Sequence, residues 1–307
     1  MKVLILGAGA IGGYYGARLI EAGAQVSFLV RAGRLEALSR LGLVVNSELG
    51  RFQQKVAAQL DAGDAGPFDL VLLACKAFDL SSAMDAIAPA VDAGAHVLPL
   101  LNGLSVYEQL DQRFGRQRVL GGVAYIATSL NARGEIDHLG QLDRFIVGAR
   151  HDSQRELAAA VHAALRAGPG IRENTDQIEQ ALWDKWATLA AGAAATCLMR
   201  ANVGQIMATE YGAKVMTQAI DECAAVASAS GYALSDETLQ QTRARLLDPA
   251  STWAASMMRD IAINARRLEA DAIVGDMARR AGQLHIPARL MEAAYSHLQA
   301  YRPVQEA

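Results

Sequence analysis

Residues 1–20 have the sequence MKVLILGAGAIGGYYGARLI, in which a short apolar run leads into a glycine-rich segment and then into a helical pattern. The spacing GxGxxG between a strand and a helix is typical of a dinucleotide site. Gly7 permits a tight turn, Gly9 lets backbone N–H groups approach the pyrophosphate, and Gly12 lets the helix pack close to the strand. A glycine-rich turn without a ligand is the alternative, but the flanking elements favour the site. We therefore assign cofactor binding to Gly7, Gly9, Ala10, Ile11 and Gly12.

The pattern along the chain divides it into two parts. Up to about residue 170, short β-branched runs alternate with helical patterns, which predicts a parallel sheet with crossover helices. After Gly168-Pro169-Gly170 the pattern is helical nearly to the end, opened by Asn174-Thr175 as an N-cap. We predict an α/β plus all-α protein, with a Rossmann-type dinucleotide-binding domain over residues 1–170 and a helical domain over residues 171–307. The strands expected in the first domain are Val3–Leu6, Val26–Val30, Leu70–Ala74, Val97–Leu101, Val119–Thr128, Glu135–Leu139 and Arg144–Gly148, with a hairpin near residues 43–56.

The composition argues against several classes of protein. A chain of 307 residues with 52% hydrophobic content is globular, and a net charge of −3 without a Lys/Arg run argues against a nucleic-acid or membrane-surface partner. The apolar start breaks at Gly7, so it predicts a strand and not a signal peptide. The most apolar later stretch, residues 189–199, is too short to span a bilayer. Three cysteines without metal-ligand spacing predict no metal site and fit a reducing cytoplasm. The expected partner is a small molecule.

The end of the second predicted strand favours NADP(H) over NAD(H). An NAD-binding chain places Asp or Glu there, on the ribose hydroxyl, whereas residues 30–34 of this chain read VRAGR and contain no carboxylate. An acid would repel a 2′-phosphate, but Arg31 can pair with it, assisted by Arg34. A solvated pair of arginines is the alternative interpretation.

Two polar positions follow predicted strands at the edge of the sheet where ligands bind. Ligands of open parallel sheets lie beyond the carboxyl ends of the strands, and Lys76 and Asn102 each follow one. Taken separately, Lys76 also fits a surface charge, and Asn102-Gly103 fits an ordinary turn. Together with a dinucleotide site, they favour a functional role.

Lys185 is the most informative residue of the helical part. It lies in Trp183-Asp184-Lys185-Trp186, within a helical apolar stripe that includes Ile178, Leu182 and Leu189. Burial disfavours an ammonium group and lowers its pKa, so a lysine placed in this way is a candidate proton donor. The alternative is a lysine whose stem packs on the core while its charged end reaches water.

A second group of candidates follows further along the helical part. Residues 251–267 are predicted to form one helix, with Ser256 and Asp260 on a common face. Glu269 comes next, and taken alone it is typical of an acid in the first turn of a helix. The spacing by itself leaves its role open.

Taken in order, these motifs resemble the ketopantoate reductase (2-dehydropantoate 2-reductase) family. The resemblance implies an N-terminal Rossmann domain, a C-terminal helical domain like that of 6-phosphogluconate dehydrogenase, and an active site in the cleft between them. It also implies NADPH as the hydride donor to a branched 2-oxo acid, as in pantothenate biosynthesis. It runs from the first residue to about residue 290 and is carried by Gly7–Gly12, Lys76, Leu101-Asn102-Gly103, Trp183-Asp184-Lys185, Ser256-Met257 and Glu269-Ala270-Asp271.

The same resemblance implies a role for each residue. Lys185 would be the general acid that protonates the developing alkoxide, and Glu269 a carboxylate that helps to hold the substrate. Asn102, Asn202 and Ser256 would contact the substrate. Lys76 would lie near the ribose of the cofactor, which Asn102 would also border.

The chain departs from the family pattern on the helix of Lys185. Family members of the pantothenate pathway carry asparagines four and eight residues after the lysine, where this chain has Leu189 and Ala193. Since polar groups that bind a substrate hydroxyl select for it, their replacement should favour a less polar 2-oxo acid. The alternatives are therefore a related reductase of such an acid, a ketone or an imine, and a non-catalytic NADP(H)-sensing protein. The apolar surface of the helical part is compatible with a homodimer, although packing within the chain would use the same stripes.

Overall fold

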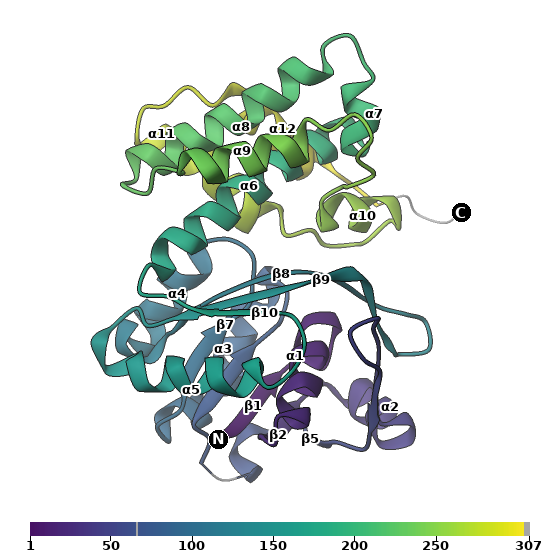
Figure 1. Cartoon of the computed structure of the whole chain (residues 1–307), viewed down its shortest axis with the longest axis vertical. Helices are drawn as coiled ribbons and strands as arrows, with labels where there is room; N and C mark the ends of the chain where they lie inside the picture. The colour runs from purple at the N-terminus through teal and green to yellow at the C-terminus, as the bar shows by residue number, and fades with distance from the viewer. Residues whose placement is uncertain (66, 304–307) are drawn as a thin grey trace. The chain divides into compact units, whose positions relative to one another are not determined.

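The computed structural model describes residues 1–65 and 67–303, which divide into two compact domains (Figure 1). The first comprises residues 1–101 and 106–179, and the second comprises residues 102–105 and the chain from residue 180 onward. The division falls between Glu179 and Gln180. β10 (Ile171–Asn174) pairs in parallel with a strand of the first domain.

The first domain is built on a parallel sheet of order β5-β2-β1-β6-β7, which confirms the predicted Rossmann-like arrangement. The central strands are largely apolar, and Val3–Ile5 of β1 and all four residues of β6 are buried, as in sheets covered on both faces. The chain first adds β2 on one side of β1 and later adds β6 on its other side. Ligands of such sheets bind where the strand order reverses in this way, which here is the carboxyl end of β1. The strands are β1 (Lys2–Leu6), β2 (Gln25–Leu29), β5 (Ala57–Gln59), β6 (Leu70–Leu73) and β7 (His96–Pro99).

A second sheet has the order β10-β9-β3-β4, with β8 paired to β9. Its further strands are β3 (Leu43–Asn46), β4 (Phe52–Gln54), β8 (Gly121–Leu130) and β9 (Ile136–Gly148). The antiparallel pair β3 and β4 is the hairpin predicted near residues 43–56. The two strands predicted at Glu135–Leu139 and Arg144–Gly148 are parts of one strand, β9, which pairs with β8 through Ile136–His138 and Asp143–Gly148, with a register shift between the two stretches.

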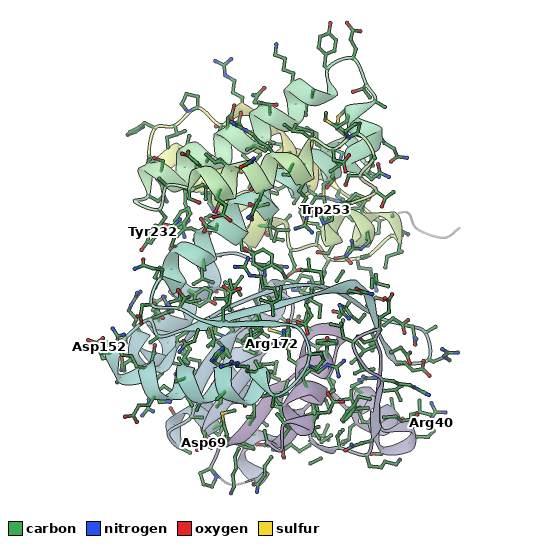
Figure 2. The ribbon with its side chains drawn as sticks, in the orientation of Figure 1. Arg40, Asp69, Asp152, Arg172, Tyr232 and Trp253 are labelled. Atoms are coloured by element: carbon green, nitrogen blue, oxygen red, sulfur yellow. The ribbon has the colours of Figure 1, made fainter. Side chains whose placement is uncertain are left out.

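The first helix, α1 (Ala10–Glu21), contacts both sheets of the first domain (Figure 1). Its Tyr14 and Tyr15 hydroxyls donate to the buried Asp143 carboxylate at 2.8 and 3.0 Å, and Arg172 (labelled in Figure 2) pairs with the same group. This network satisfies a buried charge and fixes α1 on β9. The other helices are α2 (Ala32–Leu41), α3 (Leu80–Asp92), α4 (Ser105–Phe114) and α5 (Arg155–Arg166).

The second domain is helical, as predicted, and its long helix α6 (Ile178–Met199) carries Lys185. Among the described residues, no helix is both long and apolar enough to span a membrane. In the same part of the chain, His, Cys, Asp and Glu side chains form no group of three or more that could hold a metal ion. The remaining helices are α7 (Val203–Met207), α8 (Gly212–Ala229), α9 (Asp236–Leu246), α10 (Ser256–Ala262), α11 (Asp276–Gln283) and α12 (Arg289–Ala300), and Asp271–Gly275 form a π-helical turn.

The helix predicted over residues 251–267 is shorter in the structure, where only α10 is helical. The prediction was wrong at the start because the carbonyls of Ser251 and Trp253 accept hydrogen bonds from the backbone at the start of α7. It was wrong at the end because Asn264 has a positive φ of 59°, which breaks the helix. Ser256 and Asp260 remain in one helix.

Candidate active site

The glycine loop between β1 and α1 has the geometry that the sequence predicts. Gly7 has a φ of +96°, a conformation that favours glycine. A Cβ on Gly12 would lie 2.0 Å from the carbonyl oxygen of Gly7, so this position admits no side chain. A Cβ on Gly9 would meet no protein atom within 4 Å, and Gly9 has a negative φ of −80°. The loop therefore needs Gly7 and Gly12 for its own folding, while the space at Gly9 fits the pyrophosphate of a dinucleotide.

This contrast predicts different effects for two alanine substitutions. We expect Gly12→Ala to lower the free energy of unfolding by roughly 1–3 kcal/mol, because its Cβ overlaps backbone. We expect Gly9→Ala to change it by less than about 1 kcal/mol, yet to weaken NADPH binding at least tenfold. Chemical denaturation and fluorescence titration with NADPH measure the two effects. Unchanged binding by Gly9→Ala would contradict the assignment of the loop to the cofactor.

Two arginines lie near this loop and differ in their contacts. The Arg34 Nε donates to the Ala8 carbonyl at 2.8 Å, and its Nη1 donates to the Gly134 carbonyl at 2.8 Å. Its Nη2 is buried and has no hydrogen-bond partner, and burial lowers the pKa of Arg34. Arg31 is exposed and donates from Nη2 to the Asp79 carboxylate at 3.0 Å. Arg34 thus stabilises the loop by hydrogen bonds to backbone carbonyls, while the Arg31 guanidinium is exposed to solvent.

Lys76 and Asn102 follow β6 and β7, as expected. Lys76 is exposed and precedes a short 3-10 turn, Ala77–Asp79. Asn102 is half-buried, and it belongs with Gly103 to the four residues that group with the helical domain. Gly103 has a φ of +94°, and a Cβ there would lie 2.2 Å from the Ala272 carbonyl oxygen. A close approach of two backbones therefore places Asn102 beside the π-helical turn, and the two candidates lie in different domains.

Lys185 is half-buried on α6, and its pKa is lower than that of an ordinary lysine. Burial lowers its pKa to about 8, and the nearby Glu269 carboxylate opposes part of this shift. A lysine with this pKa exchanges its proton near neutrality. The structure thus brings Lys185 and Glu269 into electrostatic contact, and Glu269 is buried, with 5% of its surface exposed.

The residues around Lys185 hold its helix against the segment of Glu269. The Trp186 Nε1 donates to the Ile273 carbonyl at 3.1 Å, within the π-helical turn that follows Glu269. The Arg280 guanidinium lies 5.4 Å from the centre of the Trp186 ring. Trp183 stacks at 5.4 Å on Tyr232, which is labelled in Figure 2. This aromatic packing fixes the orientation of α6 close to Lys185.

The remaining candidates have contacts that bear on their expected roles. Ser256 is half-buried at the first position of α10. The Asn202 side-chain oxygen accepts a hydrogen bond from the Gln205 amide at 2.8 Å, and the Gln205 side chain accepts from the Asn202 amide, so Asn202 caps α7. On α6, Ala193 is fully buried and Leu189 is half-buried. Asn202 therefore has a structural role, and the substrate contact expected of it remains a prediction.

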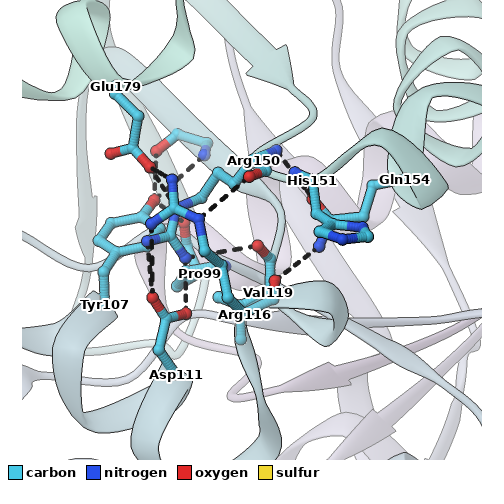
Figure 3. A network of polar contacts seen from close by, with 10 residues as sticks. Pro99, Tyr107, Asp111, Arg116, Val119, Arg150, His151, Gln154 and Glu179 are labelled. Atoms are coloured by element: carbon cyan, nitrogen blue, oxygen red, sulfur yellow. Dashed lines mark hydrogen bonds and ion pairs between the residues drawn. The ribbon is translucent and has the colours of Figure 1, made fainter.

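A buried arginine network in the first domain was missed by the sequence analysis. Figure 3 shows Arg150 paired with Asp111 through two hydrogen bonds of 2.7 and 2.8 Å and with Glu179 at 3.0 Å. Its guanidinium also lies 4.7 Å from the centre of the Tyr107 ring. Glu179 belongs to the first turn of α6, so this network holds the start of the helix that later carries Lys185.

Comparison with known proteins decides the family. One family model, described as ketopantoate reductase PanE/ApbA, matches residues 3–152, and a second, described as ketopantoate reductase PanE/ApbA C terminal, matches residues 177–302. The chain belongs to the ketopantoate reductase family. This confirms the resemblance predicted from the motifs and places the protein in a family of oxidoreductases.

Individual relatives of the ketopantoate reductase family cover nearly the whole chain. The chain is 34% identical to the uncharacterized oxidoreductase YkpB of Bacillus subtilis, over 98% of this chain and 99% of the relative. A solved structure of 2-dehydropantoate 2-reductase from Geobacter metallireducens shares 30% identity with a TM-score of 0.88, covering 97% of this chain and 99% of that one. The fold is also that of a D-mandelate dehydrogenase solved with NADH and anilino(oxo)acetate, with 21% identity, a TM-score of 0.87 and 98% of both chains covered. Since one fold can host several substrates, specificity must be argued from the site.

Proposed function

We propose that the protein is an NADPH-dependent reductase of a 2-oxo acid, with 2-dehydropantoate (ketopantoate) as the substrate and pantothenate biosynthesis in the cytoplasm as its setting. The proposal rests on one observation. Lys185 lies near the buried Glu269 carboxylate and has a pKa that burial lowers to about 8. Family membership and the glycine loop support the nicotinamide cofactor. NADPH as the donor rests on Arg31, the outward guanidinium after β2.

The residues of the first domain fit the cofactor. When bound, the dinucleotide supplies the hydride. The N–H groups at Ala10 and Ile11 start α1 and would face the pyrophosphate over the open space at Gly9. Arg31 would pair with the 2′-phosphate, and Lys76 would lie near the ribose. Each of these roles uses a group that the loop or a strand end already orients.

The residues of the helical domain supply the proton and hold the substrate. Lys185 would donate a proton to the oxygen of the keto carbon as negative charge develops there, and this interaction strengthens only in the transition state. Glu269 would accept a hydrogen bond from the substrate and keep Lys185 charged. Contacts from Asn102, Asn202 and Ser256 complete the proposed substrate site.

Leu189 and Ala193 favour a second candidate, the reduction of a less polar 2-oxo acid. Neither side chain can form a hydrogen bond with a substrate hydroxyl, and Ala193 is fully buried. A ketone or an imine is a further alternative substrate, and a non-catalytic NADP(H)-sensing protein would need neither Lys185 nor Glu269. The lowered pKa of Lys185 therefore favours an enzyme.

The test is NADPH oxidation with ketopantoate and with 2-oxo acids that lack its hydroxyl, by the wild-type protein and Leu189→Asn. If ketopantoate is the substrate, the wild-type protein turns it over with the highest kcat/KM. If the apolar residues select a less polar acid, Leu189→Asn should shift the ratio of kcat/KM toward ketopantoate by roughly tenfold, since one substrate hydroxyl gains a partner. Absence of turnover on every acid despite NADPH binding would contradict the proposed reaction and leave the cofactor site standing.

A further inference from the structure

The structure places a carboxylate against Arg31 that the sequence of β2 does not contain. The Arg31 Nη2 donates to the Asp79 Oδ2 at 3.0 Å, although the two residues are 48 positions apart. The order of the strands explains this contact. β2 and β6 flank β1, and the segments that follow both strands leave the sheet at its carboxyl edge. The Arg31 side chain is 82% exposed and the Asp79 side chain 23%, so the pair lies at the surface of the dinucleotide site.

We infer that Asp79 is a cofactor-specificity residue that opposes the 2′-phosphate at Arg31 and thereby lets the protein use NADH beside NADPH. This inference rests on the proposed function, since it concerns the same cofactor site. Arg31 alone would favour a 2′-phosphate. With Asp79 beside Arg31, the 2′-phosphate must share the guanidinium with a carboxylate, which repels it.

The position of Asp79 is fixed by its backbone. Its amide donates to the Lys76 carbonyl at 2.9 Å, and its own carbonyl accepts from the Ser82 hydroxyl at 2.9 Å. These bonds join the 3-10 turn to the start of α3. The carboxylate therefore stays near Arg31 when a ligand arrives, and its charge acts on that ligand whether or not the ion pair opens.

Charge arithmetic gives the size and sign of the effect. At the dielectric constant of water, a carboxylate about 7 Å from a doubly charged phosphate weakens the binding of that phosphate roughly five- to tenfold. NADH carries a ribose hydroxyl in place of the phosphate, and a hydroxyl can donate to a carboxylate. Asp79 is thus unfavourable for NADPH and neutral or favourable for NADH.

The test compares two nucleotides that need no substrate, 2′,5′-ADP and 5′-AMP, which differ in the 2′-phosphate. Calorimetric Kd values are measured for the wild-type protein and Asp79→Asn, which keeps the size of the side chain and removes its charge. We expect Asp79→Asn to raise the preference for 2′,5′-ADP over 5′-AMP roughly five- to tenfold at low salt, and by less at high salt because ions screen exposed charges. The ratio of kcat/KM for NADPH and NADH should move in the same direction.

Two further variants control the interpretation. Asp176→Asn removes an equal charge from another exposed pair of the same domain, where Asp176 contacts Arg155 at 2.8 Å, and should leave the preference unchanged. Arg31→Ala should weaken 2′,5′-ADP more than 5′-AMP. If both nucleotides bind and Asp79→Asn leaves their ratio at the wild-type value, the inference is overturned while the proposed function stands. If neither nucleotide binds the wild-type protein, the proposed cofactor site is overturned and the inference with it.

Discussion

Replacement of Lys185 by methionine should abolish most of the reductase activity and leave the fold intact. We expect kcat for 2-oxo acid reduction to fall by roughly 10²–10⁴, the usual contribution of a general acid, while the Kd for NADPH changes less than twofold. Methionine is unbranched and one heavy atom shorter than lysine, so it keeps most of the packed stem and removes the ammonium group, and the loss reports the proton. Steady-state kinetics and NADPH titration measure the two quantities.

The same residue predicts the pH dependence of the reaction. In the proposed reaction, reduction needs the ammonium form of Lys185, whose pKa is lowered to about 8. The kcat/KM for reduction should therefore decrease about tenfold per pH unit above this pKa, and the reverse oxidation should gain rate over the same range. A reduction rate that stays constant up to pH 10 would remove Lys185 from the role of proton donor.

Stability should respond in the opposite sense to activity. The pKa of Lys185 is about 8 in the folded protein and 10.5 in the unfolded chain. Between these values the unfolded chain binds more protons at this lysine, so the contribution of Lys185 to stability increases as the pH rises from 8 to 10.5. Below pH 8 the buried ammonium costs up to about 3 kcal/mol. Lys185→Met should remove this cost near neutral pH and lose its advantage above pH 10.5.

Lys214→Met is the matched control, because Lys214 is an exposed lysine of the same domain, on α8. It should retain both the activity and the pH dependence of the wild-type protein. A protein that is less stable at pH 7 with Lys185→Met than with Lys214→Met would contradict a net cost of burying the ammonium.

The sequence predicted the elements that rest on local pattern. Gly7 and Gly12 are required by backbone conformation and close approach, which the GxGxxG spacing encodes directly. The apolar strands of the first domain follow from composition. Lys185 stood out because a charge on an apolar helical face has few explanations.

Features that depend on distant pairing were beyond the sequence analysis. The absence of an acid after β2 suggested that no carboxylate lies beside Arg31. Asp79 pairs with Arg31 from a turn after β6, and only the strand order brings that turn close to the end of β2. Asn202 is a different case. Its spacing to Gln205 matches a capping box, a local signal that could have been recognised. The strand β10 was missed because its residues, Ile171–Asn174, include three polar side chains and are stabilised mainly by pairing with β9.

Arg150→Met should cause a large loss of stability in the first domain. The Arg150 side chain is 3% exposed and pairs with Asp111 and Glu179, which are 23% and 27% exposed. Removal of Arg150 leaves Asp111 and Glu179 with less compensation for their charges, and breaking a buried pair costs roughly 3–5 kcal/mol. Arg116 also contacts both acids, so we expect a value near the lower end, about 3 kcal/mol, by chemical denaturation.

Arg155→Met tests whether burial, and not the number of ion pairs, sets this cost. Arg155 also pairs with two acids, Asp152 and Asp176, but its side chain is 59% exposed. Exposed pairs contribute less than about 1 kcal/mol, so this variant should be nearly as stable as the wild-type protein. Arg150→Lys should fall between the two, because it keeps the charge and loses the two-point contact with Asp111. Equal losses for Arg150→Met and Arg155→Met would show that the network in Figure 3 contributes no more than surface charge does.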